Sequence, residues 1–296
     1  MHVVVASGKG GTGKTTLATA LAQVAAETQA VRVLDCDVEA PNAALFLHPQ
    51  WSSGAEVTRP VPRVDAERCT ACGRCAEVYQ FNALAVVAGS VLVFDDLCHS
   101  CGRCTWICPE QAIHEEPLMV GRIEAGRTPE GIDLAQGLLR IGQPMGLPVL
   151  RALKHWPPTT ESASVSVSAR PSPWIKIRDA PPGASCPVVE TLRGADAVVL
   201  VTEPTAFGLH DLRQVVSIVQ ELGLPAWVVI NRDGIGEAPI AAYCAEQGLP
   251  IALRIPLERR LAEALARGQS LLEAAPEYRP AIRHLLERLQ CEVGGS

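Results

Sequence analysis

Near its N-terminus the chain carries the stretch Gly8-Lys9-Gly10-Gly11-Thr12-Gly13-Lys14-Thr15, which matches the P-loop pattern G-x-x-x-x-G-K-[ST] in full. A short apolar run, Val3 to Ala6, precedes it, and an Ala/Leu-rich helical pattern follows it to about Ala26. Glycines in such a loop let successive backbone N–H groups surround phosphates at a helix N-terminus, whose dipole favours anions. The stretch therefore predicts a phosphate-binding loop between a buried strand and a helix.

Apolar strand patterns recur along the rest of the chain. A second β-type run covers residues 31–34, and two more, at residues 197–202 and 226–230, are separated by an amphipathic helical pattern at residues 209–222. Strands that alternate with helices in this way form a parallel sheet with helices on its faces. We therefore predict an α/β fold with a mostly parallel sheet flanked by helices.

Residues 57–120 interrupt this pattern and hold seven of the eleven cysteines. We therefore divide the chain into an α/β domain, residues 1–56 and 121–296, and an inserted domain, residues 57–120. Within the α/β part, residues 157–173 are rich in Ser, Pro and Thr, which predicts a flexible surface loop.

The inserted stretch contains an internal repeat of cysteines. The segment Cys69-x2-Cys72-x2-Cys75 recurs 29 positions later (98 − 69) as Cys98-x2-Cys101-x2-Cys104, and this second copy continues to Cys108-Pro109. The second copy has the full spacing of the bacterial ferredoxin run, in which thiolates ligate iron–sulfur clusters. Paired C-x2-C segments also bind zinc, but the third close cysteine and the trailing Cys-Pro favour iron–sulfur. We predict an inserted α+β domain of the bacterial ferredoxin type with two clusters.

The two predicted clusters have unequal sets of ligands, because in two-cluster ferredoxins the fourth cysteine of each run ligates the other cluster. The first cluster, a [4Fe–4S] cluster, is assigned Cys69, Cys72, Cys75 and Cys108, and the second is assigned Cys98, Cys101 and Cys104. Tyr79 stands where the fourth cysteine of the first run is expected. The second site should then hold a [3Fe–4S] cluster, or a [4Fe–4S] cluster capped by water, tyrosinate or a ligand from a partner.

The composition of the chain limits the other possibilities. Of its 296 residues 48% are hydrophobic and 20% charged, and the net charge of -6 argues against a nucleic-acid partner. No run approaches the roughly 20 apolar residues of a membrane span, and the N-terminus lacks the pattern of a secretory signal. An odd number of clustered cysteines suits metal binding in a reducing compartment. We expect a cytoplasmic protein with no integral membrane segment.

Lys9 occupies a position that the general P-loop pattern leaves free. With it, the loop resembles the deviant P-loop of the MinD/ParA/Mrp superfamily, to which the nitrogenase iron protein also belongs, and the cysteine repeat resembles members of that superfamily with an inserted ferredoxin domain. The resemblance implies an ATPase that is slow and stimulated by a partner. It also implies that ATP joins two subunits into a homodimer and that Lys9 contacts the partner's nucleotide. The alternative is a solvated lysine.

The resemblance also assigns the remaining residues of an ATP and Mg²⁺ site. The implied ATP-binding residues are Gly8, Lys9, Gly10, Gly11, Thr12, Gly13, Lys14, Thr15, Thr16 and Asn231. The implied catalytic residues are Lys9, Lys14 and Asp37, where Asp37 positions or activates water, and the implied Mg²⁺ site contains Thr15, Asp35 and Asp179. Asn42 would support the loop after Asp37, and Ile255-Pro256 would lie along the base. In the alternative interpretation the three aspartates are ordinary caps at strand ends.

The other cysteines and the C-terminal stretch receive separate predictions. Cys186 lies seven residues after Asp179 (186 − 179), a spacing similar to that of a cluster cysteine in the nitrogenase iron protein, so it is a possible switch residue or a small packed residue. Cys36, Cys244 and Cys291 are expected to be packing or surface residues. A C-terminal stripe of Ile282, Leu285, Leu286 and Leu289 is expected to pack against the protein body rather than bind a membrane.

Three functions are compatible with these patterns. In the first, an ATP-driven dimer switch gates electron transfer through the ferredoxin insert to a partner protein. In the second, the protein assembles or carries iron–sulfur clusters, as in the Mrp branch, for an acceptor protein. In the third, it is a ParA-like positioning ATPase whose clusters sense redox state.

Overall fold

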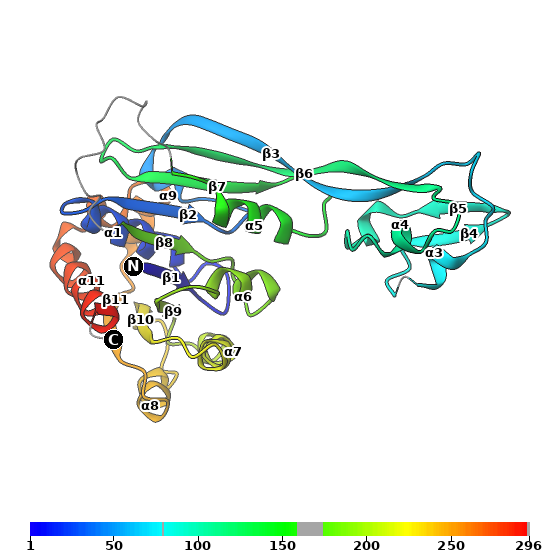
Figure 1. Ribbon diagram of the computed structural model, residues 1–296. Coiled ribbons are helices and arrows are strands. Elements are labelled where there is room, and N and C mark those ends of the chain that lie inside the picture. The colour runs from blue at the N-terminus through cyan, green and yellow to red at the C-terminus, as the bar shows by residue number, and fades with distance from the viewer. Residues whose placement is uncertain (79, 159–173, 295–296) are drawn as a thin grey trace.

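The computed structural model describes residues 1–78, 80–158 and 174–294, and within them nine strands form one sheet (Figure 1). From one edge to the other, the strands are β11 (Ile251–Pro256), β10 (Ala226–Asp233), β9 (Ala197–Thr202), β1 (His2–Ala6), β8 (Ile175–Asp179), β2 (Val31–Asp35), β7 (Asp133–Leu139), β6 (Ile113–Arg127) and β3 (Gln50–Val64). The run from β11 to β7 is parallel, and β6 and β3 add an antiparallel edge. The prediction of a mostly parallel α/β sheet is confirmed.

Helices cover both faces of this sheet, so its central strands are buried on two sides; β1 and β9 are almost entirely apolar, whereas β8 and β2 also bury Arg178 and Arg32. One face carries α1 (Lys14–Ala26), α10 (Leu271–Ala274) and α11 (Arg279–Gly294), and the other carries α6 (Cys186–Leu192), α7 (Ala206–Glu221) and α8 (Ile240–Glu246). The remaining helices of the α/β part are α2 (Ala44–Leu47), α5 (Leu147–His155), α9 (Arg259–Ala266) and a 3₁₀ turn, η2 (Pro276–Tyr278).

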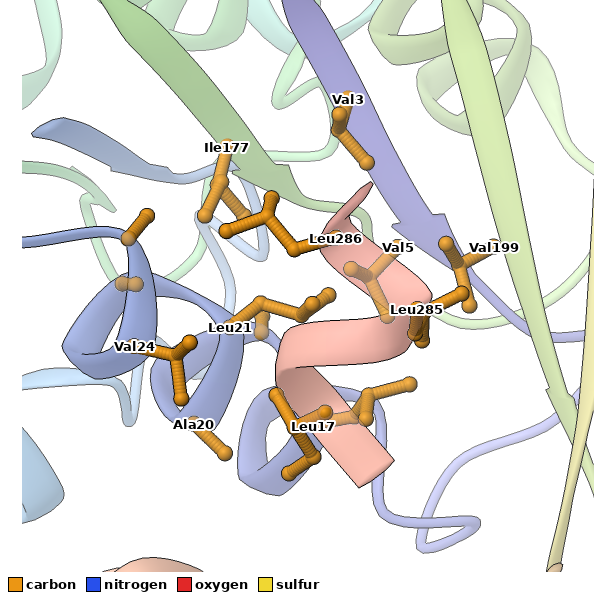
Figure 2. Packing of buried hydrophobic residues seen from close by; sticks show 14 of the residues in the cluster. Val3, Val5, Leu17, Ala20, Leu21, Val24, Ile177, Val199, Leu285 and Leu286 are labelled. Carbon is orange, nitrogen blue, oxygen red and sulfur yellow. The ribbon is translucent and has the colours of Figure 1, made fainter. Parts of the chain in front are cut away.

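The C-terminal helix packs into the main core. Figure 2 shows Leu285 and Leu286 of α11 among the side chains of Val5 on β1 and Leu17 and Leu21 on α1. All five side chains are at most 5% exposed. Burial of one such side chain contributes roughly 1.5–3 kcal/mol relative to its exposed state. The prediction that the C-terminal apolar stripe packs against the body is therefore confirmed.

The long hairpin of β3 and β6 leads away from the sheet to the cysteine-bearing segment (Figure 1). The two strands pair continuously from Gln50 opposite Arg127 to Val64 opposite Ile113, so they run across both predicted domain boundaries, and a register shift at Val57 and Thr58 lies at the first of them. At the outer end lie α3 (Arg74–Glu77), β4 (Leu84–Val87), β5 (Ser90–Val93), η1 (Asp95–Leu97) and α4 (Arg103–Ile107). Tyr79, and residues 159–173 of the predicted flexible loop, lie outside the described residues.

The outer segment repeats its backbone with the same 29-residue offset as its sequence. Three pairs of residues have positive φ at equivalent positions: Ala71 and Ser100 (53° and 54°), Gly73 and Gly102 (84° and 71°), and Asn82 and Gln111 (55° and 48°). Four of these six are not glycine, and such residues rarely adopt this conformation. Corresponding hydrogen bonds also repeat, from the Asp65 N–H to the Ala112 carbonyl and from the Phe94 N–H to the Ala83 carbonyl, both 2.8 Å. The cysteine repeat is therefore a structural repeat.

Candidate nucleotide and cysteine sites

The glycine loop lies between β1 and α1, where the sequence predicts it, and its shape depends on contacts with distant segments. Gly13 has a φ of 95°, and a Cβ at this position would stand 2.3 Å from the Asn231 side-chain amide. That amide donates a hydrogen bond of 2.7 Å to the Thr12 carbonyl. Gly8 is equally constrained, because its Cβ would stand 2.2 Å from the Asp211 carbonyl oxygen. The loop is therefore held in one conformation from two sides.

Two buried aspartates meet beside this loop. Asp35 ends β2 and Asp179 ends β8, and the register of the two parallel strands sets them opposite each other. The Thr15 hydroxyl donates a hydrogen bond to one Asp179 carboxylate oxygen. The other Asp179 oxygen, Oδ1, is buried and has no hydrogen-bond partner among the described residues. Carboxylate and hydroxyl oxygens are ligands that Mg²⁺ prefers, so this group fits the predicted Mg²⁺ site.

Asp35 also organises the loop that follows β2. Its carboxylate accepts backbone hydrogen bonds from Asn42 (2.8 Å), Ala43 (2.9 Å) and Asp37 (3.2 Å). This arrangement holds Asp37 beside the loop, half-buried, where its carboxylate faces the cavity. The interpretation of the aspartates as isolated strand-end caps does not account for their convergence on one point.

Burial and mutual proximity shift the pKa values of the three aspartates and of Lys14. Burial raises the pKa of Asp35 to about 6, and burial with the nearby Asp35 charge raises the pKa of Asp179 well above its usual range. Burial also raises the pKa of Asp37, although Lys14 opposes the shift. The pKa of Lys14 is lowered by burial, and all three carboxylates oppose that change. Three carboxylates face a single ammonium group, so a divalent cation at this point would favour their ionised forms.

A cavity of about 410 Å³ opens over the loop. Of the predicted residues, its lining contains Gly10, Gly11, Gly13, Lys14, Thr15, Thr16, Asp37, Asn42, Asn231, Ile255 and Pro256. The lining also contains residues that were not predicted, because their positions follow from tertiary packing and not from a motif: Phe46 on α2, Arg232 on β10, Leu257 after β11 and Leu261 on α9. The cavity has both a polar end, at the phosphate loop, and an apolar wall.

Lys9 has a specific partner within the chain. Its ammonium group lies 2.8 Å from the carboxylate of Glu203, which also forms an ion pair of 2.6 Å with Arg232. The Glu203 side chain is 4% exposed, whereas that of Lys9 is 33% exposed. The sequence analysis did not predict this pairing. The only available signal was the position of a carboxylate directly after the buried strand β9.

The first set of cysteines surrounds one cavity. Cys69, Cys72, Cys75 and Cys108 all line it, although Cys108 is 33 positions beyond Cys75 (108 − 75). Burial raises the pKa of the Cys75 thiol, and the nearby Cys69 and Cys72 add to that effect. The Ala112 N–H points to the Cys108 sulfur at 3.3 Å. The structure thus brings together the four residues that the swapped assignment groups.

The second set comes together at the equivalent place in the repeat. Cys98 and Cys104 are each 3% exposed, whereas Cys101 is exposed. Burial raises the pKa of Cys104, and Cys98 and Cys101 add to the shift. The Ser100 N–H points to the Cys98 sulfur at 3.3 Å. Three sulfurs from one short loop fit a cluster with one open corner.

Neither set has the geometry of a site for a single metal ion. Among the described residues, no three Cys, His, Asp or Glu side chains are close enough to hold one ion together.

The other cysteines differ in exposure. Cys36, directly after β2, is 0% exposed and Cys244 on α8 is 1% exposed, whereas Cys291 is exposed, as expected for packing and surface residues. Cys186 is the first residue of α6 and is exposed, so it is not a small packed residue. Its role as a switch residue stays a prediction.

Residues 3–272 match the model of a single family, described as the CobQ/CobB/MinD/ParA nucleotide binding domain. The chain belongs to this family. The family contains the P-loop ATPases MinD and ParA, and its model spans the phosphate loop, the aspartates and the wall of the cavity. Within the described residues, no helix has both the length and the apolar character needed to cross a membrane.

Individual relatives cover almost the whole chain. The uncharacterized protein MJ0579 of Methanocaldococcus jannaschii is 29% identical to this chain, and the match covers 92% of both chains. The uncharacterized protein MJ0578 of the same organism is 26% identical, and the match covers 98% of this chain and 96% of the other. MinD of Pyrococcus horikoshii, solved as a complex with Mg-ADP, matches with a TM-score of 0.54 at 18% identity, over 97% of this chain and 95% of that chain. A ParA family ATPase of Chlorobium tepidum matches with a TM-score of 0.51 at 14% identity, over 97% and 96%. The likeness to these two structures shows a shared fold.

Proposed function

We propose that this MinD/ParA-type protein hydrolyses ATP and carries two iron–sulfur clusters, and that an ATP-driven homodimer switch gates electron transfer through residues 57–120 to a partner redox protein. One observation carries the proposal. In a chain whose other residues form a nucleotide site, four cysteines with ferredoxin spacing line a single cavity. Neither feature alone suggests coupling, but the β3–β6 hairpin joins the cysteine segment directly to the sheet that carries the nucleotide site.

The nucleotide end of the proposed cycle uses the groups around the phosphate loop. Backbone N–H groups of the loop and Lys14 would bind the phosphates of ATP, and Asn231 would keep the loop open. Thr15, Asp35 and Asp179 would hold Mg²⁺, which when bound neutralises charge on the β- and γ-phosphates. Asp37, half-buried beside them, would orient the attacking water.

The proposed dimer switch depends on Lys9. In the single chain its ammonium group pairs with Glu203, so it must leave this carboxylate before it can contact the nucleotide of a second subunit. Arg232 stays beside Glu203 and would keep that buried carboxylate paired after Lys9 departs. The ion pair thus stabilises the unpaired subunit, and ATP in a second subunit competes for Lys9.

At the other end, the clusters would supply one-electron chemistry, and the residues of the chain would bind them and set their surroundings. Cys69, Cys72, Cys75 and Cys108 would hold the first cluster. Cys98, Cys101 and Cys104 would hold the second, with one iron not bound by cysteine. Because β3 and β6 join this segment directly to the sheet edge, a rearrangement of the ATPase part would move the clusters relative to a partner.

A second candidate function is favoured by the three-cysteine set. A cluster with an open iron is held more weakly, and Cys101 is exposed, so this cluster would suit transfer to an acceptor protein. In that case the protein would be a cluster carrier of the Mrp type. The third possibility, a ParA-like positioning ATPase with redox-sensing clusters, would need the clusters to control ATP hydrolysis without electron or cluster transfer.

The test uses protein reconstituted anaerobically with iron and sulfide. We expect MgATP to change the rate at which a ferrous chelator bleaches the reduced clusters by at least about threefold in the wild-type protein, and to have no effect in a Lys9→Ala variant. Lys154→Ala, which removes a lysine on α5 that pairs with Glu190, serves as the control and should respond like the wild type. An equal bleaching rate with and without MgATP would contradict gating. Iron-free protein after reconstitution would contradict the cluster sites.

Transfer experiments separate the two leading functions. Reduced protein mixed with an apo-ferredoxin should keep its iron if it transfers electrons, and should lose iron from one cluster if it is a carrier. Nucleotide-dependent appearance of a holo-ferredoxin would favour the carrier.

A further inference from the structure

A buried arginine holds the loop that begins the second cysteine set. Arg59 on β3 is 4% exposed. Its guanidinium donates hydrogen bonds to the carbonyls of Cys98 (2.8 Å) and Asp95 (2.7 Å) and a longer one to the Ser100 hydroxyl (3.4 Å). These three hydrogen bonds hold the loop in place. None of their acceptors carries a charge.

The carboxylate nearest to Arg59 is committed to another arginine. Asp95 accepts two hydrogen bonds from Arg63, at 2.7 and 2.9 Å, and among the described residues no carboxylate forms an ion pair with Arg59. Glu116 approaches Arg63 from outside at 3.7 Å, but its side chain is 54% exposed and is therefore screened by water. The Asp95 carboxylate also interacts electrostatically with Arg59, but two arginines share this one carboxylate, so a further negatively charged group beside the buried guanidinium would be favourable.

The first cysteine set has no such arginine. The repeat offset of 29 equates Arg59 with Ala88 (59 + 29) and Arg63 with Leu92 (63 + 29). Arg68 and Arg74, which lie near the first set, are both exposed, and Arg59 is the only buried arginine within the described part of residues 57–120. The set that lacks one thiolate is therefore the set that has a buried cation.

We propose that Arg59 is the buried counter-charge of the second cluster and that this cluster is, in consequence, the electron-accepting end of residues 57–120. The inference rests on the proposed function. The buried positive charge of Arg59 would favour the negative charge that reduction adds to the second cluster, and the first set has no equivalent cation among the described residues. With clusters bound at both sets, one electron would pass from the group held by Cys69, Cys72, Cys75 and Cys108 to the group held by Cys98, Cys101 and Cys104 beside Arg59. No bond forms or breaks and no proton moves. The electron comes from a low-potential one-electron donor, for which dithionite serves in the test.

The experiment is a potentiometric titration, followed by EPR, of full-length protein reconstituted without oxygen. A Cys69→Ala variant assigns the signals, because it removes a ligand of the first cluster only. We expect the second cluster of the wild-type protein to be reduced at a higher potential than the first. Arg59→Met should lower the reduced-to-oxidised ratio of the second cluster about tenfold at a fixed potential, equal to about 59 mV for one electron. The first cluster should not change.

Two further variants separate charge from loop structure. Arg59→Lys keeps the positive charge and should retain most of the wild-type ratio, although its hydrogen bonds differ. Arg68→Met removes an exposed arginine that donates to the Glu110 carbonyl beside the first set, and should leave both clusters as in the wild type. Thermal unfolding of each apoprotein reports any loss of loop stability independently of the potentials.

The outcomes decide between three situations. Equal or reversed reduction potentials of the two clusters in the wild type would overturn this assignment. So would an Arg59→Met variant in which both potentials shift alike or neither shifts. Both outcomes would leave the cluster sites in place. A lower unfolding temperature with an unchanged second potential would make Arg59 a structural clamp and would also overturn it. Should Arg59→Met fail to fold, the order of the two wild-type potentials decides. Wild-type protein without iron would instead overturn the proposed function and this inference together.

Discussion

The nucleotide site and the cysteine-bearing segment are built in opposite ways. The first combines Thr15, Asp35, Asp179 and Asn231, which are far apart in the sequence and meet because parallel strands end at one edge of the sheet. The second takes all of its cysteines from residues 69–108, in two copies of one short loop. A site of the first kind depends on strand register, and a site of the second kind depends on local backbone conformation. The two should therefore fail independently.

The largest expected effect is on the nucleotide site alone. Lys14→Ala should lower ATP hydrolysis by at least about 100-fold, since it removes the cation that faces the phosphates. The iron content after reconstitution should equal that of the wild type, because no cysteine contacts the loop. Steady-state phosphate release and iron analysis measure the two properties. A parallel loss of iron would show that the two regions are not independent.

The complementary change affects the cysteine segment alone. Cys108→Ala removes the single ligand that the second run contributes to the first cavity and leaves three cysteines there, as at the second site, so we expect the first cluster to lose part of its iron. Basal ATP hydrolysis should not change. Cys291→Ala, which removes an exposed cysteine on α11, is the matched control and should keep all iron. Full iron content in Cys108→Ala would contradict the swapped assignment.

The buried carboxylates predict a pH dependence of the nucleotide end. The folded pKa of Asp35 is about 6, above its ordinary value of 3.8, so the folded metal-free protein binds more protons than the unfolded chain between these values. The free energy of unfolding of the metal-free protein should thus fall by about 2–3 kcal/mol as the pH rises from about 4 to 6. Asp35→Asn should remove the contribution of Asp35 to this slope in urea titrations and leave that of Asp179. Affinity for Mg²⁺ should change in the opposite direction and increase through pH 6.

A smaller effect is expected from the shape of the phosphate loop. Gly13→Ala places a methyl group against Asn231 in a backbone conformation with positive φ, which should cost about 1–3 kcal/mol and weaken ATP binding. Gly142→Ala has a similar φ of 87° but no atom within 4 Å of its Cβ, so it isolates the backbone strain. Calorimetric ATP affinity should fall in the first variant only. Equal affinities would mean that the contact with Asn231 does not shape the loop.

The smallest effect concerns the pairing of Lys9. Glu203→Gln removes the negative charge that pairs with Lys9. It should therefore strengthen MgATP-dependent dimerisation by about fivefold, or about 1 kcal/mol. Sedimentation at several protein concentrations measures the dimer constant. Glu263→Gln, which alters an exposed ion pair with Arg259 on α9, is the control. Weaker dimerisation in Glu203→Gln would indicate that this carboxylate supports the dimer instead.

Local features of both regions were predictable from sequence. The phosphate loop, its flanking strand and helix, and the strand at Ala197–Thr202 follow from glycine positions and apolar runs, which specify backbone conformation over a few residues. The ends of the strands were predicted less accurately. The predicted run at residues 226–230 extends to Asp233 in β10, because pairing with β11 continues past the end of the apolar pattern.

By itself, the sequence predicted a class of ligand for each region: phosphate at the glycine loop, which the family confirms as a nucleotide-binding domain, and iron–sulfur at the cysteine repeat, which stays a prediction. Only the tertiary structure decided which distant groups meet, namely Asp35 with Asp179, Lys9 with Glu203, and Arg59 with the loop at Cys98. The physical reason is that the apolar run of a buried parallel strand does not specify which strand lies beside it or in which register the two pair. Those contacts depend on the order and register of whole strands, and they set the charge around each site.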